Sequence, residues 1–427
     1  MRAVRPREHS FTNEVDSWVS EATSSGVHRF DDLLRWLPGV YPLEAAASVR
    51  RLRADGDLSN TDASRLLAGT TSRNRIVEGR LSFPAPHPLD SDWRFTSPTS
   101  AMLLHESMAV RKPGDTVICL GTPSVFQEAH WQGMGRSTRL IDGNTAVICH
   151  FAQLGLAPQV WQADLLSDPL PPVRSSVVVA DPPWYPDEMT AFLWSASRIC
   201  TFGGHVLISI PARGTRPGIA AEVGRLLDYS RTVGFEVTRV EPGVLEYESP
   251  PFERNALKAA GIALSSGNWR RADLCVLRLA VELNAPRPLP TRISESWYEE
   301  ALFGTRMRLR KKFVRRFADP TIIKLVNGDV LPTVSRRHSL RTSVDVWTTG
   351  NRVFACAGTA ILRIIVRSLA CRQDPVVRVA FALRRALSNR ERELIGVAAE
   401  QSVALAAQEQ RDFGIAGIGS SPGGTYL

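Results

Sequence analysis

The sequence predicts an α/β fold organised around a mainly parallel β-sheet. From about residue 98 onward, short apolar runs alternate with segments of helical periodicity, which is the pattern of consecutive βαβ units. One run, residues 176–180, is almost continuously apolar and β-branched, as expected for a strand that is covered on both faces of a parallel sheet. Pro182 and Pro183 follow it, and because proline lacks a backbone N–H the strand must end there.

The other elements of this sheet are placed by their own patterns. Helices are expected at residues 100–110, 146–156, 189–200 and 219–233. Strands are expected at residues 115–120, 137–141, 159–163, 176–180 and 204–210. Two further apolar runs, residues 235–240 and 273–280, are expected to close the sheet as an antiparallel pair.

At 427 residues the chain is too long for one simple core, and four segments are predicted. Residues 1–80 follow a helix, break, helix and basic-turn pattern that is typical of a winged-helix-like module, which would dock nucleic acid or substrate or form a plain helical lid. Residues 81–284 form the α/β domain. Residues 285–413 form a basic, largely helical region whose helical tail is a candidate for homo-oligomerisation, and residues 414–427 are glycine-rich and expected to be disordered.

Composition restricts the partners and the compartment. The net charge of +9 suggests a polyanionic partner, although charge alone does not separate nucleic acid from acidic protein. The six cysteines are scattered without a Cys-x-x-Cys pair, which favours a reducing cytoplasm and predicts no zinc knuckle or other metal site. The most apolar late stretch, residues 353–370, contains Arg363 and Arg367 and is too short and charged to cross a membrane.

The segment Asp181-Pro182-Pro183-Trp184 is the strongest candidate for a catalytic site. It follows a buried strand at the carboxyl edge of the sheet, where ligands of open α/β sheets bind. A carboxylate at 181 and the carbonyl of Pro182 can accept the two N–H bonds of an amine and direct its lone pair at an electrophile, while Trp184 or Tyr185 stacks on the acceptor. The plainer alternative is a strand-ending turn with a capping acid.

A second candidate site follows the first predicted strand, residues 115–120, at Gly121-Thr122-Pro123-Ser124. Gly121 permits close approach of a ligand to the backbone, and the helix that begins at Pro123 would offer free N–H groups to an anion. The next two strands end in Asp142 and Asp164, and an acid at such a position binds ribose hydroxyls in dinucleotide folds. Three successive strands therefore end in an acid at one edge of one sheet.

These motifs together resemble the S-adenosylmethionine (SAM) dependent amino-methyltransferases. The resemblance covers roughly residues 98–282 and is to the adenine-N6 and lysine-N group that includes a zinc-knuckle ribosomal-RNA adenine-N6 methyltransferase. The donor motif precedes Asp-Pro-Pro-Trp here, unlike the order in the MT-A70 family. The resemblance implies a Rossmann-like sheet and SAM as cofactor, with its methionyl carboxylate at Gly121–Ser124, its ribose at Asp142 and its adenine amine at Asp164.

Further residues are candidates for substrate contacts. Tyr247 and Phe252 lie between the two closing strands, where each would stack on a base or serve as an ordinary loop anchor. Residues 87–95, just before the α/β domain's first helix, would form a wall of the pocket or a domain-docking clasp. A basic cluster follows residue 305, with phenylalanines interleaved, and suits a nucleic-acid backbone groove, whereas the plainer alternative is a solvated face. Its cations are Arg306, Arg308, Arg310, Lys311, Lys312, Arg315 and Arg316.

The leading hypothesis is a cytoplasmic SAM-dependent methyltransferase that acts on an exocyclic amine, above all N6 of adenine in RNA or DNA. A protein lysine N-methyltransferase is the first alternative, because the same acceptor geometry serves a protein amine. An aminopropyltransferase of the branched-polyamine synthase type is the second, although residues 121–124 lack the acidic cluster that such chemistry wants. A nucleic-acid-binding regulator without catalytic activity is the third.

Overall fold

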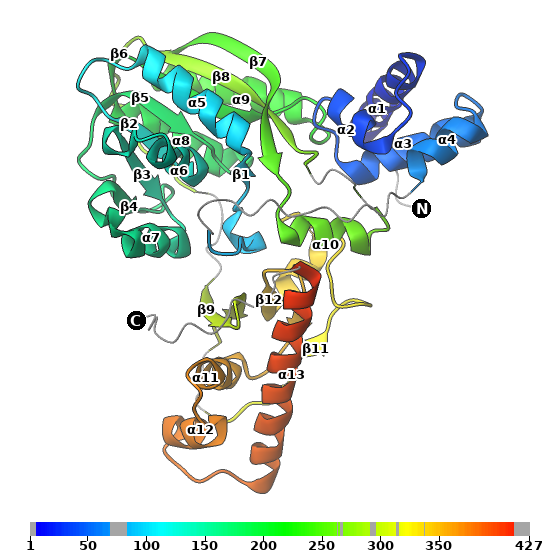
Figure 1. Ribbon diagram of the computed structural model, residues 1–427, viewed down its shortest axis with the longest axis vertical. Helices are drawn as coiled ribbons and strands as arrows, with labels where there is room; N and C mark the ends of the chain where they lie inside the picture. The colour runs from blue at the N-terminus through cyan, green and yellow to red at the C-terminus, as the bar shows by residue number, and fades with distance from the viewer. Residues whose placement is uncertain are drawn as a thin grey trace. The chain divides into compact units, whose positions relative to one another are not determined.

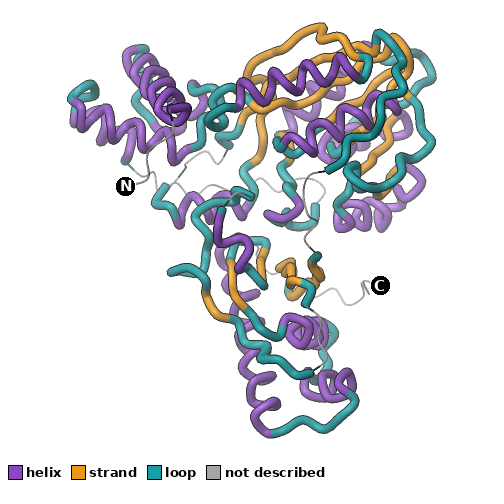
Figure 2. Tube along the Cα trace, turned by 180° about the vertical axis from the view of Figure 1, so that it is seen from behind, coloured by secondary structure: helices purple, strands orange, loops and turns teal. Residues whose placement is uncertain are grey.

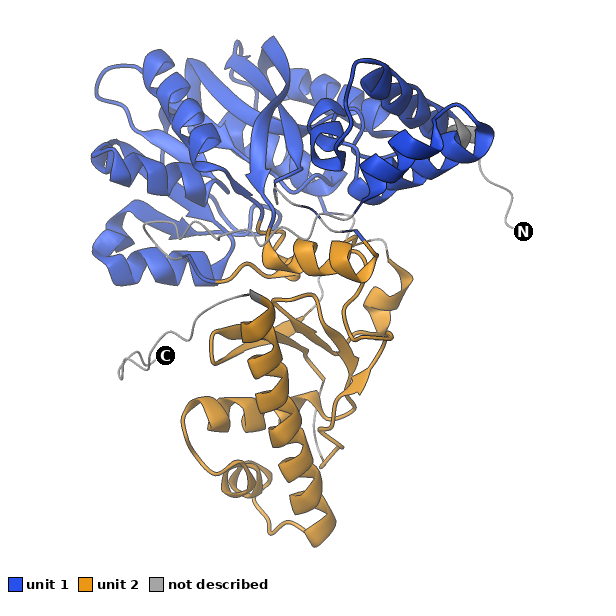
Figure 3. Cartoon of the chain, turned by 45° about the vertical axis from the view of Figure 1, so that its right-hand side comes forward, with its two compact units in different colours: residues 1–84, 93–249, 262–292 blue, residues 85–92, 250–261, 293–427 orange. Residues whose placement is uncertain are grey.

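The computed structural model describes residues 6–68, 83–262, 264, 268–290, 296–312, 316–336 and 338–413. The chain divides into two compact units (Figure 3). The first comprises residues 1–84, 93–249 and 262–292, and the second comprises residues 85–92, 250–261 and 293–427. The helices of the predicted module 1–80 thus group with the α/β sheet. The predicted disordered tail, residues 414–427, lies outside the described residues.

The first unit is built on an eight-stranded sheet in the order β1-β7-β8-β6-β5-β2-β3-β4 (Figure 1). The strands are β1 (Arg94–Phe95), β2 (Val117–Leu120), β3 (Thr138–Asp142), β4 (Val160–Gln162), β5 (Ser175–Ala180), β6 (Cys200–Pro211), β7 (Phe235–Glu248) and β8 (Arg271–Leu279). Strands β2 to β6 pair in parallel, and β8 runs antiparallel to both β6 and β7. The predicted α/β fold with a parallel sheet and an antiparallel closing pair is confirmed.

Helices cover both faces of this sheet (Figures 1 and 2). One face carries α5 (Ser97–Val110), α6 (Pro123–Trp131) and α7 (Thr145–Phe151), and the other carries α8 (Pro186–Ile199) and α9 (Ile219–Thr232). Alternate residues of β2 therefore enter different cores: Val117 and Cys119 pack on the first face, and Ile118 and Leu120 on the second. Burial on both faces explains why the central strands lack polar alternation.

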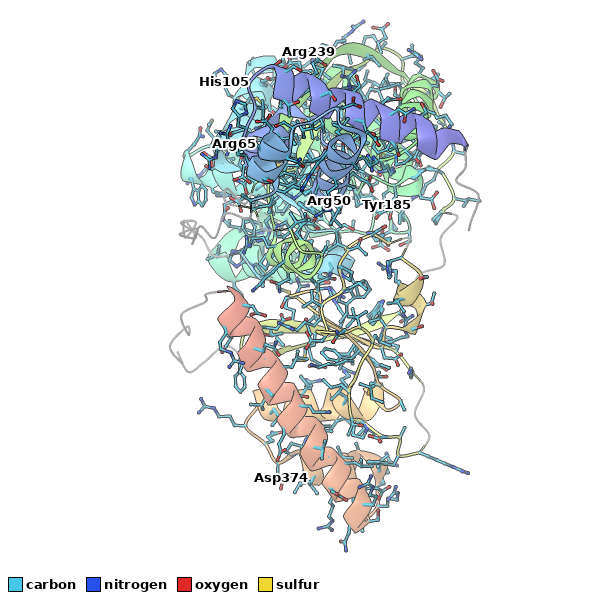
Figure 4. The ribbon with its side chains drawn as sticks, turned by 90° about the vertical axis from the view of Figure 1, so that its right-hand side faces the viewer. Arg50, Arg65, His105, Tyr185, Arg239 and Asp374 are labelled. Atoms are coloured by element: carbon cyan, nitrogen blue, oxygen red, sulfur yellow. The ribbon has the colours of Figure 1, made fainter. Side chains whose placement is uncertain are left out.

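Four helices precede the sheet: α1 (Pro6–Ser24), α2 (Phe30–Trp36), α3 (Pro42–Asp55) and α4 (Asn60–Leu67). The predicted break between the second and third falls at Pro38-Gly39, where Gly39 has a φ of +76° and a Cβ would lie 3.0 Å from the Cβ of Ala212. Of the basic residues before the following turn, Arg51 binds Asp16 at 2.8 Å, and Arg50 is exposed (Figure 4). Residues 69–82 lie outside the described residues, and the winged-helix assignment stays a prediction.

The second unit contains a five-stranded antiparallel sheet in the order β11-β13-β12-β10-β9. Its strands are β9 (Trp297–Leu302), β10 (Thr305–Arg310), β11 (Ile323–Lys324), β12 (Val346–Thr348) and β13 (Val353–Ala355). Its helices are α10 (Pro251–Ala259), α11 (Thr359–Ala370), α12 (Pro375–Leu383) and α13 (Asn389–Phe413). The sequence pattern predicts a largely helical region here, and the five-stranded sheet departs from that prediction. In the parts of the chain that the structure describes, no helix is long and apolar enough to cross a membrane.

Candidate active site

Asp181 lies at the carboxyl edge of the parallel sheet, one residue beyond β5. Its N–H donates to the carbonyl of Leu120 at 3.2 Å, so the neighbouring strands β2 and β5 end side by side. Gly121 follows β2 directly and Asp142 ends β3, which places the predicted donor and acceptor segments at one edge of one sheet. This is the edge at which α/β folds bind their ligands.

The Asp181 carboxylate is partly buried and held by two hydroxyl donors. The Tyr247 hydroxyl donates to Oδ1 at 2.6 Å, and the Ser209 hydroxyl donates to the same oxygen. Burial raises the pKa of Asp181 to about 7, while the bonds from Ser209 and Tyr247 and the charge of Arg270 act in the opposite direction. Removal from water disfavours the carboxylate, and donors to the ionised form favour it. Asp181 is therefore a carboxyl group that changes charge near neutral pH.

Tyr247 and Phe252 do not form exposed stacking surfaces. Tyr247 belongs to β7, where it pairs with Phe95 of β1, and it is only 1% exposed. Burial and the neighbouring Asp181 raise the pKa of Tyr247 well above its usual value, so its hydroxyl remains a donor. Phe252 is also 1% exposed and lies on α10, in the second unit. The long segment predicted between the two closing strands thus forms the second half of β7 and then the helix α10.

Trp184 is 6% exposed and belongs to the core of the first unit. Its ring meets that of Tyr247 edge-on, with the centroids 5.8 Å apart. The guanidinium carbon of Arg270 lies 4.0 Å from the Trp184 ring centroid and 4.1 Å from that of Trp93. A cation therefore lies against the indole that the sequence analysis assigned to base stacking.

Other contacts fix the backbone of the Asp-Pro-Pro-Trp segment. Arg216 donates to the carbonyl of Trp184 at 2.9 Å and also pairs with Glu222, in the first turn of α9. The N–H of Tyr185 donates to the carbonyl of Pro183 at 2.7 Å. Tyr185, labelled in Figure 4, is the N-cap residue of α8 and is partly exposed. Of Trp184 and Tyr185, the two rings predicted to stack on the acceptor, Tyr185 is the one that remains partly open to solvent.

The predicted donor loop has the local geometry of a glycine-dependent turn. Gly121 has a φ of +63°, its N–H donates to the carbonyl of Ile141 at 2.9 Å, and a Cβ there would lie 2.9 Å from the ring of Phe192. Thr122 and Ser124 are buried, and Pro123 occupies the first turn of α6. The N–H groups at 124 and 125 lie in the first turn of a helix, where no carbonyl of the same helix can accept from them.

Asp142 and Asp164 close local turns at the ends of adjacent strands. Oδ1 of Asp142 accepts from the N–H of Asn144 at 2.7 Å. Asp164 is exposed, and its Oδ1 accepts from the N–H of Leu166 at 3.0 Å. Asp142 ends β3, Asp164 lies two residues beyond the edge strand β4, and each acid orders its own loop. Their assignment to the ribose and to the adenine amine stays a prediction.

The predicted basic cluster is largely neutralised within the second unit. Arg306 is 5% exposed and binds Asp90 and Glu299, at 2.6 and 2.7 Å. Arg308 binds the same two acids, each at 2.6 Å. Because β10 alternates its side chains, its arginines share one face. There Arg306 and Arg308 meet Glu299 of the paired strand β9 and Asp90 from a distant segment. The expectation of an open cationic groove therefore does not hold for these two arginines.

The remaining cations of the cluster differ in their surroundings. Arg310 donates to the carbonyl of Val344 at 2.8 Å and lies over the ring of Trp297. Lys312 binds Asp345 at 2.8 Å. Lys311 and Arg316 are exposed. Arg315 lies outside the described residues.

The residues 87–95 divide between the two units. His87 is fully buried in the second unit, where its Nε2 lies 3.0 Å from the carbonyl oxygen of Trp347, and Asp90 binds the two arginines of β10. Trp93 belongs to the first unit and packs on Arg270. Residues 87–92 thus belong to the second unit and residues 93–95 to the first, and the pocket wall and the clasp both stay predictions.

Sequence reasoning missed three side chains that contact the acceptor segment: Ser209, Arg216 and Arg270. A signal existed for Ser209, because β6 pairs with β5 and the register Ala180 with Ile208 places Ser209 beside Asp181. Arg216 and Arg270 lie in loops, and no local pattern marks them.

Comparison with known proteins supports the fold. No protein-family model and no curated protein sequence matches the chain. The branched-chain polyamine synthase of Thermus thermophilus, solved with N4-aminopropylspermidine and 5'-methylthioadenosine, matches with a TM-score of 0.51 and 13% identity over 67% of this chain and 96% of that chain. A mutein of the same enzyme matches with a TM-score of 0.51 and 13% identity, over 66% and 93%.

A 16S ribosomal-RNA N2-G1207 methyltransferase of Thermus thermophilus matches more weakly, with a TM-score of 0.29 and 14% identity over 55% of this chain and 50% of that chain. The strand order and the first of these likenesses define the class: the first unit has a Rossmann-like methyltransferase fold.

Proposed function

We propose that this chain is a SAM-dependent transferase that methylates an amine nitrogen held at Asp181. The observation that carries the proposal is the Asp181 carboxylate itself. It is partly buried at the ligand-binding edge of the sheet, and its Oδ1 is fixed by Ser209 and Tyr247. The glycine turn at Gly121 follows the neighbouring strand β2 and leads into α6. We assign Oδ2 of Asp181 to the acceptor amine.

The donor loop fits SAM. The N–H groups at 124 and 125, at the positive end of α6, suit the methionyl carboxylate. Asp142 ends β3 and would bind the ribose, and Asp164, two residues beyond β4, would bind the adenine amine. Bound SAM supplies a sulfonium carbon that is open to attack by a nucleophile. The donor of aminopropyl transfer lacks that carboxylate, and residues 121–124 contain no acid to replace the interaction. Methyl transfer is therefore the better supported reaction.

Asp181 can prepare the acceptor in two ways. Towards a nucleobase amine, the carboxylate accepts an N–H bond and orients the nitrogen. Towards an alkylammonium group, it can also take the proton that must leave before the nitrogen has a lone pair. A pKa of about 7 suits a general base that works near neutral pH.

Adenine N6 is one candidate acceptor. The Asp-Pro-Pro-Trp segment supports it through the resemblance to adenine-N6 methyltransferases, and the net charge of +9 supports a nucleic-acid partner. Tyr185 is the partly exposed ring that would stack on the base.

A cationic alkylamine, such as a lysine side chain or a polyamine, is the candidate that the geometry supports better. Trp184 and Tyr247 are buried, and the Trp184 indole already packs on a guanidinium, which is an environment for a cation rather than for a neutral base. The pairing of Arg306 and Arg308 with acids also reduces the charge available to a nucleic acid. The branched-chain polyamine synthase that shares the fold was solved in complex with a polyamine, N4-aminopropylspermidine.

Transfer of tritium from methyl-labelled SAM to separated RNA, DNA, protein and small-amine fractions tests the proposal. We expect label in the protein or small-amine fraction. Label in nucleic acid alone would select the nucleobase acceptor instead. Absence of label in every fraction, together with no heat of SAM binding at millimolar concentration, would contradict the enzyme and favour the non-catalytic regulator.

Replacing Tyr247 with phenylalanine is expected to shift the pH dependence of transfer upward. Activity should rise with pH as Asp181 ionises, with a midpoint near 7 in the parent protein. The Tyr247 hydroxyl favours the ionised form, so its removal should raise that midpoint by about one pH unit, given roughly 1.4 kcal/mol per unit. The measurement is kcat/KM against pH, with Tyr229→Phe on α9 as the matched control. An unchanged midpoint would show that Tyr247 does not set the ionisation of Asp181.

A further inference from the structure

Three aromatic side chains surround the guanidinium of Arg270. Its central carbon lies 4.1 Å from the ring centroid of Trp93, 4.0 Å from that of Trp184 and 5.8 Å from that of Tyr247. The planes of Trp93 and Trp184 are each nearly perpendicular to that of Tyr247, at 90° and 83°. Two indoles thus form walls and the phenol ring a base, and we call this group the aromatic cage.

The cage is joined to the candidate catalytic residue. The hydroxyl of Tyr247, whose ring forms the base of the cage, donates to Asp181 at 2.6 Å. The charge of Arg270 acts on the same carboxylate, since it lowers the pKa of Asp181. Aromatic cages with a nearby carboxylate are suited to organic cations, because ring faces and the carboxylate both attract positive charge while the rings exclude water.

We propose that Trp93, Trp184 and Tyr247 form the binding site for the cationic nitrogen of the acceptor, and that Arg270 is the resident cation which the acceptor replaces. The exchange substitutes one monovalent cation for another, so the charge beside Asp181 is conserved. A neutral acceptor could not displace Arg270 without leaving the cage uncharged. The cage therefore selects alkylammonium and guanidinium groups over neutral amines.

The backbone of Arg270 is placed for such an exchange. Its carbonyl accepts from the N–H of Tyr247 at 3.0 Å, just before β8 begins, so the main chain is anchored independently of the guanidinium. The Arg270 side chain is only partly buried, whereas Tyr247 and Trp184 are buried. Movement of this one side chain would open the cage while the rings remain packed.

Binding of n-butylammonium, followed by tryptophan fluorescence, tests the cage directly. We expect Arg270→Ala to bind this cation at least tenfold more tightly than the parent protein, and the uncharged analogue n-butanol to gain no affinity. Adding Trp93→Leu to Arg270→Ala should remove the gain. Arg271→Ala is the matched control, because Arg271 binds the carbonyl of Gly243 and leaves Arg270 in place.

A thermal measurement covers the case in which Arg270→Ala is destabilised. Ethylguanidinium at millimolar concentration should raise the Tm of Arg270→Ala and leave that of the parent protein unchanged. The inference is overturned if neither cation distinguishes Arg270→Ala from the parent protein, or if n-butanol binds as well as n-butylammonium.

The assignment of the cage to the acceptor rests on the proposed function, but both readouts are independent of SAM and of turnover. Cation binding without methyl transfer would refute the proposed function and leave the cage standing. Methyl transfer without cation binding would refute only the cage.

Discussion

Replacement of Asp181 by asparagine is expected to lower kcat/KM for methyl transfer by about 100- to 1000-fold, or roughly 3–4 kcal/mol of transition-state stabilisation. Asparagine keeps the shape of the side chain but carries no charge and cannot take a proton from an ammonium group. Ser209 and Tyr247 would still have an oxygen to which they can donate. The measurement is the initial rate of label transfer at saturating SAM.

Two comparisons make this expectation specific to the acceptor. Calorimetric binding of SAM should change by less than twofold in Asp181→Asn, because the donor loop lies on a different strand. Asp228→Asn, an exposed acid on α9, should behave like the parent protein. If Asp181→Asn kept more than half of the parent rate, Asp181 would be a structural capping acid, the plainer alternative considered for this segment.

The largest effect on stability is expected from Arg352→Met in the second unit. Arg352 is 3% exposed and pairs with Asp329, Asp412 and Glu409. Glu409 is fully buried, and burial raises its pKa. Removing Arg352 takes the counter-charge from the buried Glu409 and leaves the buried Asp329 with only the exposed Lys324, at 3.4 Å. Breaking a buried ion pair in this way typically costs about 3–5 kcal/mol. Urea unfolding at pH 7.5 measures the loss.

Acid should reduce the difference between Arg352→Met and the parent protein. Without Arg352 the carboxylates bind protons more readily in the folded state, so the deficit should be largest above neutral pH and shrink as the pH falls and they become protonated. Arg390→Met is the control, because Arg390 forms an exposed pair with Glu393 and should cost no more than about 0.5 kcal/mol. Equal losses in the two variants would show that the buried network contributes no more than a surface pair.

The elements of the first unit were predictable because their signals are local. The apolar strand before Asp181, the glycine turn at Gly121 and the acids at 142 and 164 each follow from the residues immediately around them. The alternation of β10 is equally local, since Met307 and Leu309 point into the core between arginines. This two-residue period is the signal of a strand, whereas the density of cations favoured a nucleic-acid groove.

The contacts that decide the chemistry of the site are long-range. Arg306 and its partner Asp90 are 216 residues apart in the sequence, and Tyr247 and Asp181 are 66 apart. No window of sequence reveals such pairs, because they depend on which strands become neighbours. For the same reason, the burial of Tyr247 and the cation against Trp184 could not be foreseen, although both residues were identified as important.

Label transfer from methyl-tritiated SAM to a primary alkylamine, measured for the parent protein and for Asp181→Asn side by side, tests the central claim most directly. We predict that the parent protein incorporates label, that incorporation requires the ionised carboxyl group of Asp181, and that the rate falls at least 100-fold in Asp181→Asn. Incorporation at equal rates in both proteins would contradict it.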